Sequence, residues 1–267
     1  MNITQAIILG IVQVLTEFLP ISSTAHLILV PKLLGWEDPG LTFDVALHLG
    51  TLVALLIYFQ RDWIDLVRSG IQYLRGRSKD PLFFYIVLAT IPAGLAGLFL
   101  EKLADRELRD VRVIALALIV LALILVLAEL RGRKQKTLAQ MSLADAMAVG
   151  CAQALALVPG VSRSGVTITA GLFRGMKRDA AARFSFFLST PLIAGAAGKK
   201  LIDVLQEGLP STAMSSFIAG ILASGVVGYL AIKLLLRYLQ QHSTFVFVYY
   251  RIALGIILFL AFWRGLR

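Results

Sequence analysis

The chain has 267 residues, of which 58% are hydrophobic and 16% charged, and its mean hydropathy is +0.81. Soluble domains average roughly 45–50% apolar and about 25% charged residues, so a soluble domain of this length could not bury so much apolar surface. The composition excludes an ordinary soluble enzyme, a disordered chain and a disulfide scaffold. The net charge of +10 comes from basic residues mostly between apolar runs, a pattern typical of cytoplasmic loops. We therefore expect an all-α polytopic membrane protein surrounded by membrane lipids, with no nucleic-acid partner.

Six apolar runs are close to the roughly 20 residues that a helix needs to cross a bilayer. They cover residues 42–60, 82–100, 111–130, 184–200, 214–236 and 245–263. Two further apolar segments, 3–31 and 143–172, are interrupted by the polar, proline-containing stretches 19–26 and 158–167. Irregular polar backbone at membrane depth occurs only where protein buries it or where it lines a wet cavity. We therefore predict about six spanning helices and two re-entrant helix–loop–helix hairpins.

The two hairpins resemble each other when the chain is shifted by 140 residues. Over 6–35 and 146–175 seven positions are identical, among them Gln13/Gln153 and Ser22/Ser162, and both polar interruptions fall in register. Three spans follow each hairpin, and an odd number of spans requires the second half to insert upside down. We predict a single membrane domain, 1–267, with inverted repeats of about 1–135 and 136–267, an architecture typical of transporters.

The distribution of Lys and Arg predicts the orientation. One topology places loops 61–80, 131–136, 174–183 and 233–242 in the cytoplasm with fifteen basic residues, against nine on the opposite side. Because cytoplasmic loops carry the excess of Lys and Arg, both termini should lie outside. The first hairpin then enters from outside and the second from the cytoplasm, so that their tips can meet within the membrane.

Glu17 lies in the first apolar segment, four residues after Gln13, so both side chains share one face of a helix. A carboxylate in this setting is costly unless it is paired, hydrated or bound to a metal. We interpret Glu17 as a metal ligand or general base, with Gln13 as a neutral oxygen ligand. The alternative is an interfacial glutamate at a helix end.

Ser22, Ser23, Thr24 and His26 follow at the first interruption. Any one of these hydroxyls can instead cap the second half-helix, whose first N–H groups need acceptors. Histidine serves as acid, base or nucleophile near neutral pH, so we favour a functional His26 over a structural one.

The second interruption contains Arg163, whose planar fork matches a phosphate group. Gly160 and Gly165 allow the backbone to approach a ligand. Ser162, Ser164 and Thr167 add hydroxyls at an expected helix N-terminus, where an anion is favoured. We predict an anion site, and a structural ion pair of Arg163 with Glu17 is compatible with it before the anion binds.

Other polar residues in apolar runs have plainer interpretations. Asp44 and His48 lie near the outer end of the 42–60 run, where a hydrated face explains them. Arg251 follows two tyrosines and should snorkel or pair. Gly220, Ser224 and Gly228 form a small-residue ladder, which suits helix packing or a homodimer face.

The motifs QVLTEFLPISSTAHL at 13–27 and PGVSRSGVT at 159–167 closely resemble those of the undecaprenyl-diphosphate phosphatases, the bacitracin-resistance family. The family signature is an E/Q-x-x-x-E helix followed by FLPxSSxxH, together with PGxSRSxxT. The resemblance runs the whole length of the chain, including FDVALHLGT at 43–51. Gln13 stands where many members have Glu, which removes one negative ligand and weakens a two-carboxylate metal scheme.

The resemblance implies hydrolysis of undecaprenyl diphosphate to undecaprenyl phosphate and inorganic phosphate. This reaction recycles the lipid carrier for peptidoglycan and other envelope polymers and confers bacitracin resistance. The resemblance also implies a divalent cation, Mg or Ca, as cofactor. It places the protein in the bacterial cytoplasmic (inner) membrane, with its site open to the outer face.

The residues and the resemblance together assign roles to the two motifs. We expect the catalytic residues to be Glu17, Ser23, His26 and Arg163. We expect the headgroup to be bound by Ser22, Thr24, Gly160, Ser162, Arg163, Ser164 and Thr167, and the metal by Glu17 and Gln13. Attack on phosphorus comes from Ser23 activated by His26 or Glu17, from His26 itself, or from water.

A transporter is the competing interpretation, because inverted repeats with broken helices suit alternating access. Such a protein would flip an anionic polyprenyl phosphate lipid across the membrane without releasing phosphate. The hydroxyl cluster beside His26 favours hydrolysis, since transport needs no nucleophile.

Overall fold

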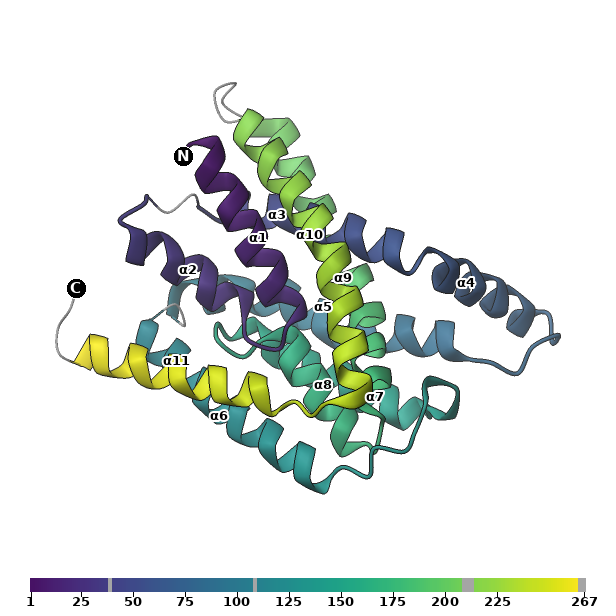
Figure 1. The fold of residues 1–267 in the computed structure, drawn as a ribbon. Coiled ribbons are helices and arrows are strands. Elements are labelled where there is room, and N and C mark those ends of the chain that lie inside the picture. Colours follow the sequence, from purple (N-terminus) through teal and green to yellow (C-terminus); the bar gives the residue numbers. More distant parts are fainter. Residues whose placement is uncertain (38–39, 108–109, 208–213, 264–267) are drawn as a thin grey trace.

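The structure is a computed structural model that describes residues 1–37, 40–107, 110–207 and 214–263. These residues form helices, apart from connecting turns and an isolated parallel β-bridge between Lys136 and Met176. The predicted all-α membrane fold is thereby confirmed (Figure 1). The helices are α1 (Ile3–Phe18), α2 (Ser23–Leu34), α3 (Gly40–Tyr58), α4 (Gln60–Leu74), α5 (Leu82–Glu107), α6 (Val111–Arg131), η1 (Leu138–Gln140), α7 (Leu143–Ala154), η2 (Leu155–Leu157), α8 (Arg163–Phe173), α9 (Arg178–Glu207), α10 (Met214–Gln241) and α11 (Phe245–Trp263).

Both interrupted segments break where the sequence predicts, and each break is shorter than expected. The first turn covers residues 19–22 between α1 and α2, and the second covers residues 158–162 between η2 and α8. Helix α1 packs on α2, and α7 packs on α8. The four helices have 16, 12, 12 and 11 residues, so each is shorter than the roughly 20 residues that cross a bilayer. These lengths suit helices that enter the membrane and turn back.

The described helices support four or five spans, where the sequence predicts six. Stretches of α5, α6, α9 and α10 are long and apolar enough to cross a membrane. Helix α3 reaches that standard only together with α4, from which it is bent by 73°. The apolar part of α11, Phe245–Ala261, falls among the shorter helices. All six predicted runs are helical, but the first ends at a bend and the last is short.

The hairpins pack on different helices of the bundle. Helix α1 lies along α10, whereas α7 lies along α5, and the backbones approach closely at both contacts. A Cβ atom on Gly10 would lie 2.4 Å from the backbone oxygen of Gly220, and one on Gly150 would lie 2.2 Å from that of Ala89. Only glycine fits at such distances, so these two positions fix how the hairpins sit in the bundle.

The small-residue ladder of α10 packs inside the molecule. Gly220, Ser224 and Gly228 are buried against α1 and α3, and a Cβ atom on Gly228 would collide with the side chains of Val14 and Ala54. The ladder therefore serves helix packing within one chain. A homodimer stays a prediction that this face does not support.

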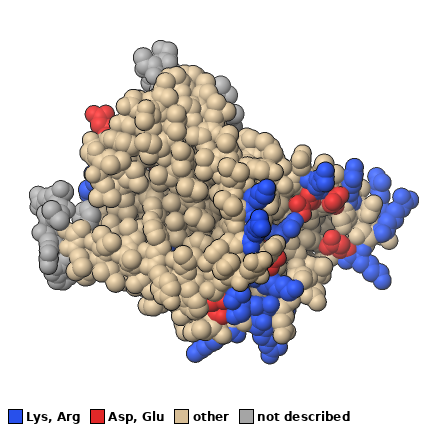
Figure 2. Space-filling view, viewed as in Figure 1, with Lys and Arg blue, Asp and Glu red and all other residues tan. Residues whose placement is uncertain are grey.

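The four predicted cytoplasmic loops gather at one end of the molecule, where Figure 2 shows most of the visible Lys and Arg side chains. Two buried carboxylates, Glu129 and Asp145, bind residues in or beside these loops. Glu129 accepts hydrogen bonds from Arg178 and from the Thr244 hydroxyl (2.8 Å), and Asp145 accepts from Arg174 Nε (2.7 Å). The N-terminus lies at the opposite end from α4 (Figure 1). The basic residues thus mark one end of the bundle, as the loop assignment requires.

Candidate active site

A cavity of about 240 Å³ lies where the two hairpin turns meet. Both hairpins and the span α3 supply its polar lining, and α5 and α9 supply apolar walls. The polar lining consists of Thr16, Glu17, Ser22, Ser23, Thr24, His48, Gln153, Ser162 and Arg163. Both polar sequence motifs therefore converge on one cavity, although some 140 residues separate them.

The two turns deliver their functional side chains in the same way. Ser22 and Ser162 are the N-caps of α2 and α8, with φ angles of 77° and 67°. Their hydroxyls accept hydrogen bonds from Ala25 N (3.4 Å) and Gly165 N (3.1 Å). A positive φ is uncommon for a residue other than glycine, and here it directs the chain into each helix. The first helical residues, Ser23 and Arg163, then lie at the cavity.

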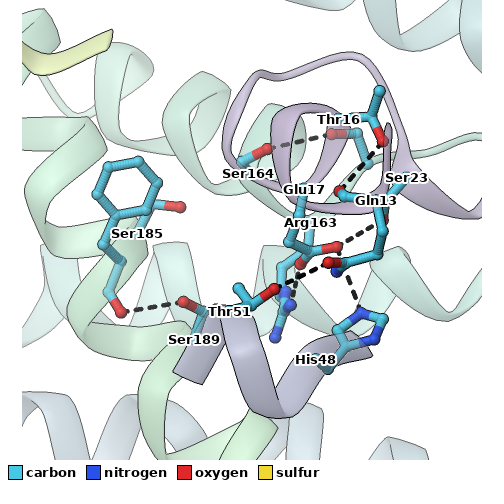
Figure 3. Close-up of polar contacts among 12 residues, drawn as sticks. Gln13, Thr16, Glu17, Ser23, His48, Thr51, Arg163, Ser164, Ser185 and Ser189 are labelled. Atoms are coloured by element: carbon cyan, nitrogen blue, oxygen red, sulfur yellow. Dashed lines mark hydrogen bonds and ion pairs between the residues drawn. The ribbon is translucent and has the colours of Figure 1, made fainter. Parts of the chain in front are cut away.

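Glu17 is the centre of the site, and its side chain is 7% exposed. Its Oε2 accepts a hydrogen bond from the Ser23 hydroxyl at 2.5 Å, and its Oε1 accepts one from Arg163 Nη2. His48 Nε2 lies 3.5 Å from Oε2. Figure 3 shows the carboxylate between these three partners. Burying a carboxylate requires such partners, and the ion pair with Arg163 crosses between the two hairpins.

His48 reaches the site although its sequence context suggested only a hydrated face. Its Nδ1 lies 2.7 Å from the backbone oxygen of Asp44, one turn earlier in α3, which orients the ring so that Nε2 faces Glu17. Thr51 donates to Gln13 Oε1 at 2.9 Å, so this face of α3 meets the helix that carries Glu17. His48 lies three residues before Thr51, and positions three apart share a face of a helix. This spacing on an apolar helix was the signal available in the sequence.

His26 lies outside the cavity. Its Nδ1 lies 2.7 Å from the backbone oxygen of Ser22, so this nitrogen donates, and Nε2 accepts from the Tyr250 hydroxyl at 2.6 Å. The two rings are stacked, with centroids 5.7 Å apart. One turn beyond Ser23, the imidazole faces α11 instead of the hairpin turns. The structure therefore brings Glu17, Ser23 and Arg163 together and leaves His26 apart.

The predicted headgroup residues divide into two groups. Ser22, Thr24, Ser162 and Arg163 line the cavity. Three others, Gly160, Ser164 and Thr167, are absent from its lining and have structural partners. Gly160 presents its oxygen to Arg251 (3.1 Å), Ser164 donates to Leu19 O (3.2 Å), and Thr167 shares a hydrogen bond with Ser185 (2.7 Å). For Ser164 and Thr167 helical geometry explains the division, because successive residues of α8 point in different directions. Gly160 lies in the turn, and its oxygen faces Arg251.

Gln13 is fully buried and does not line the cavity. Its Oε1 accepts hydrogen bonds from the hydroxyls of Thr51 (2.9 Å) and Ser224 (3.0 Å). As a second metal ligand, it would have to give up these bonds.

The donor set suits a cation that is held partly by the substrate. The residues that the structure describes contain no group of three or more His, Cys, Asp or Glu side chains able to hold a metal. Mg²⁺ is commonly bound by one or two carboxylates together with waters and substrate phosphates, whereas Ca²⁺ takes six to eight oxygen ligands. Glu17, as a single buried carboxylate in a polar cavity, fits the first arrangement.

Arg251, which does not line the cavity, binds backbone oxygens of both turns. Its side chain is 1% exposed, and no carboxylate among the described residues pairs with it. Nη1 donates to Pro20 O at 3.2 Å, and Nη2 donates to Gly160 O and Val161 O, each at 3.1 Å. The expectation of a snorkelling or ion-paired arginine is therefore wrong, because both turns expose backbone oxygens that no helix satisfies. An arginine within an apolar run was the signal for this role.

Comparison with known proteins agrees with both motifs. The family model described as bacitracin resistance protein BacA matches residues 6–257. An undecaprenyl-diphosphatase of Moorella thermoacetica is 51% identical, over 98% of this chain and 99% of its own. Proteins with the same name from Desulforudis audaxviator and Geobacter sulfurreducens are each 49% identical, over 99% and 96% of this chain and 100% and 96% of their own. The chain therefore belongs to the bacitracin resistance protein BacA family.

Proposed function

We propose that the cavity between the hairpin turns is the catalytic centre of an undecaprenyl-diphosphatase. This enzyme hydrolyses undecaprenyl diphosphate to undecaprenyl phosphate and inorganic phosphate, which recycles the lipid carrier of cell-wall synthesis and confers bacitracin resistance. The observation that carries the assignment is the contact of Glu17 with both Ser23 and Arg163 at one cavity. A nucleophile, a base and a phosphate-binding cation are the groups that phosphoryl transfer requires.

Ser23 is the proposed nucleophile and Glu17 its base. The hydroxyl of Ser23 already donates to Glu17 Oε2, so the carboxylate takes the proton when Ser23 Oγ attacks the terminal phosphorus. A bond forms between Oγ and phosphorus, and the bond between phosphorus and the bridging oxygen breaks. Undecaprenyl phosphate leaves, and water then hydrolyses the phosphoserine. Of the alternatives that the sequence leaves open, this route uses groups already in contact.

Arg163 stabilises the negative charge on the transferred phosphoryl group. One of its N–H groups donates to Glu17, and the fork of a guanidinium has four more. Arg163 can therefore bind phosphate oxygens while keeping its contact with the carboxylate. His48 holds the same carboxylate from the other side and orients it toward Ser23.

The proposed cofactor is a divalent cation, Mg or Ca, for which Glu17 is the protein ligand. When bound, such a cation would neutralise negative charge on the phosphate groups. Gln13 as a second ligand stays a prediction.

The protein is an integral membrane protein, and we place it in the bacterial inner membrane. The basic loops at one end of the bundle support a cytoplasmic location for that end. The first hairpin then enters from the periplasmic face, and the site opens to that face. The polyprenyl tail remains among membrane lipids while the headgroup enters the cavity.

The test is phosphate release from undecaprenyl diphosphate by the purified protein in detergent, with and without EDTA. We expect release that stops when EDTA removes the cation. In proteoliposomes, a flippase would instead move labelled lipid phosphate between leaflets without releasing phosphate. Lipid movement without hydrolysis, from a folded and monodisperse sample, would replace the phosphatase proposal with the transporter.

A further inference from the structure

Among the residues that the structure describes, Gln153 is the one buried residue lining the cavity whose side-chain polar atoms are all without hydrogen-bond partners. Its side chain is 1% exposed, and neither Oε1 nor Nε2 makes a hydrogen bond. It lies in α7, two residues before the 3-10 turn that leads to Arg163. A buried primary amide normally has partners for both atoms, so its position points to a polar ligand.

The helix that carries Gln153 is firmly fixed. One turn earlier, Gly150 brings α7 against the backbone of α5 at Ala89, and Ser142 caps the start of the helix. The amide therefore cannot find partners by a shift of its helix. The unmet hydrogen bonds must be supplied from the cavity, where Arg163 and Ser162 lie on the same hairpin and Glu17 and Ser23 on the other.

The chemistry of the cavity identifies the ligand. Glu17 and Arg163 neutralise each other before substrate binds. A diphosphate brings many acceptor oxygens and little to donate, so it needs further N–H donors that carry no compensating negative charge. An amide nitrogen has two N–H groups and meets this need. Its oxygen then accepts a hydrogen bond from water bound with the headgroup.

We propose that Gln153 binds the diphosphate headgroup, with its Nε2 donating to a phosphate oxygen. This inference rests on the proposed function, and it assigns to the second hairpin a substrate-binding residue in addition to Arg163. Gln153 contributes affinity for the isoprenyl diphosphate and has no part in proton transfer or in attack on phosphorus.

The test is Gln153→Met, which keeps the length of the side chain and removes both polar atoms. The KM for undecaprenyl diphosphate should rise at least about tenfold, while kcat falls less than about threefold, because a hydrogen bond to the bound charged headgroup is lost. The Tm of the substrate-free protein should stay the same or rise, because an unsatisfied buried amide is removed.

Gln13→Met is the matched control for stability. Gln13 occupies the equivalent position of the first hairpin, and its Nε2 also lacks a partner, but its Oε1 accepts hydrogen bonds from Thr51 and Ser224. Its loss should therefore lower the Tm. A lowered Tm in Gln153→Met would indicate a structural partner and overturn the inference. An unchanged KM would overturn it as well.

A second variant, Gln153→Glu, tests the sign of the ligand. A negative side chain should repel the phosphate oxygens and raise KM more than Gln153→Met does. The phosphate assignment would be overturned if KM stayed at or below that of the wild type and activity required a lower concentration of the cation. Position 153 would then be a metal-ligand site. Absence of phosphate release by the wild-type protein in the same assay would instead count against the proposed function itself.

Discussion

In the first hairpin Glu17 precedes the turn and Ser23 opens the second helix, whereas in the second hairpin the equivalent positions hold Leu157 and Arg163. The backbones of the two turns correspond closely, with capping serines at positive φ in both. The carboxylate and the proposed nucleophile lie on one hairpin, and the guanidinium lies on the other. In the proposed mechanism, a phosphoryl group bound between the hairpins is attacked from the first and stabilised by the second.

Arg251 shows why the two turns must be held in register. The oxygens that it binds, from Pro20 and Gly160, belong to equivalent positions of the two turns. A single residue outside both hairpins thus fixes their relative position. The inverted repeat itself stays a prediction, supported by the common capping geometry of the two turns.

The largest expected effect separates two neighbouring serines of the first hairpin. Ser23→Ala should lower kcat by about 10⁴-fold or more, because it removes the nucleophile. Ser22→Ala should cost less than about tenfold, since Ser22 caps α2 and its hydroxyl accepts from Ala25 N. Phosphate release from undecaprenyl diphosphate measures both variants. Equal activities at equal folded amounts would remove the assignment of Ser23.

The next effect tests the chemistry of the second hairpin. Arg163→Ala should lower kcat by about 10³-fold, comparable to the loss of a preorganised transition-state donor. Arg163→Lys should recover only part of this, because lysine keeps the charge and lacks the planar fork. Activity of Arg163→Ala as high as that of Ser22→Ala would refute the two-hairpin site.

Arg251 should matter less for chemistry and more for folding. Arg251→Met leaves the carbonyls of both turns without a donor, which should lower the free energy of unfolding by about 3 kcal/mol. We expect kcat to fall about 10²-fold with KM less affected, because the turns lose their register. Arg251→Lys should partly restore kcat and Tm. A stable Arg251→Met protein with full activity would show that the turns keep their register without this residue.

Much of the site could be predicted from the sequence because its residues interrupt apolar runs. Glu17, Ser23 and Arg163 stand out against a hydrophobic background, and any such residue in a membrane segment needs a partner. The charge distribution of the loops and the match between the two hairpins at an offset of 140 residues together predict that the two hairpin tips meet within the membrane. The fold class followed from composition alone.

The direction in which a polar side chain points was harder to predict than its location within an apolar segment. Glu17, His26 and His48 all lie in apolar segments. Only the contact of His26 with Tyr250 of α11 and the packing of α3 on α1 decide which imidazole faces the carboxylate. Sequence proximity favoured His26, which is nine residues from Glu17, over His48, which is 31 residues away. Composition also does not reveal the bend of 73° after α3, which is one reason why the described helices support four or five spans and not six.

The two histidines provide the smallest and most discriminating comparison. His48→Gln should lower kcat about tenfold, because Glu17 loses a partner that orients it toward Ser23. His26→Gln should change kcat less than about threefold, since its nitrogens are engaged by Ser22 O and the Tyr250 hydroxyl. Phosphate release at saturating substrate, with Tm as the control for folding, measures both. A larger loss of kcat in His26→Gln at unchanged Tm would mean that α2 turns during catalysis to bring His26 to the phosphate, and it would restore His26 as the competing nucleophile.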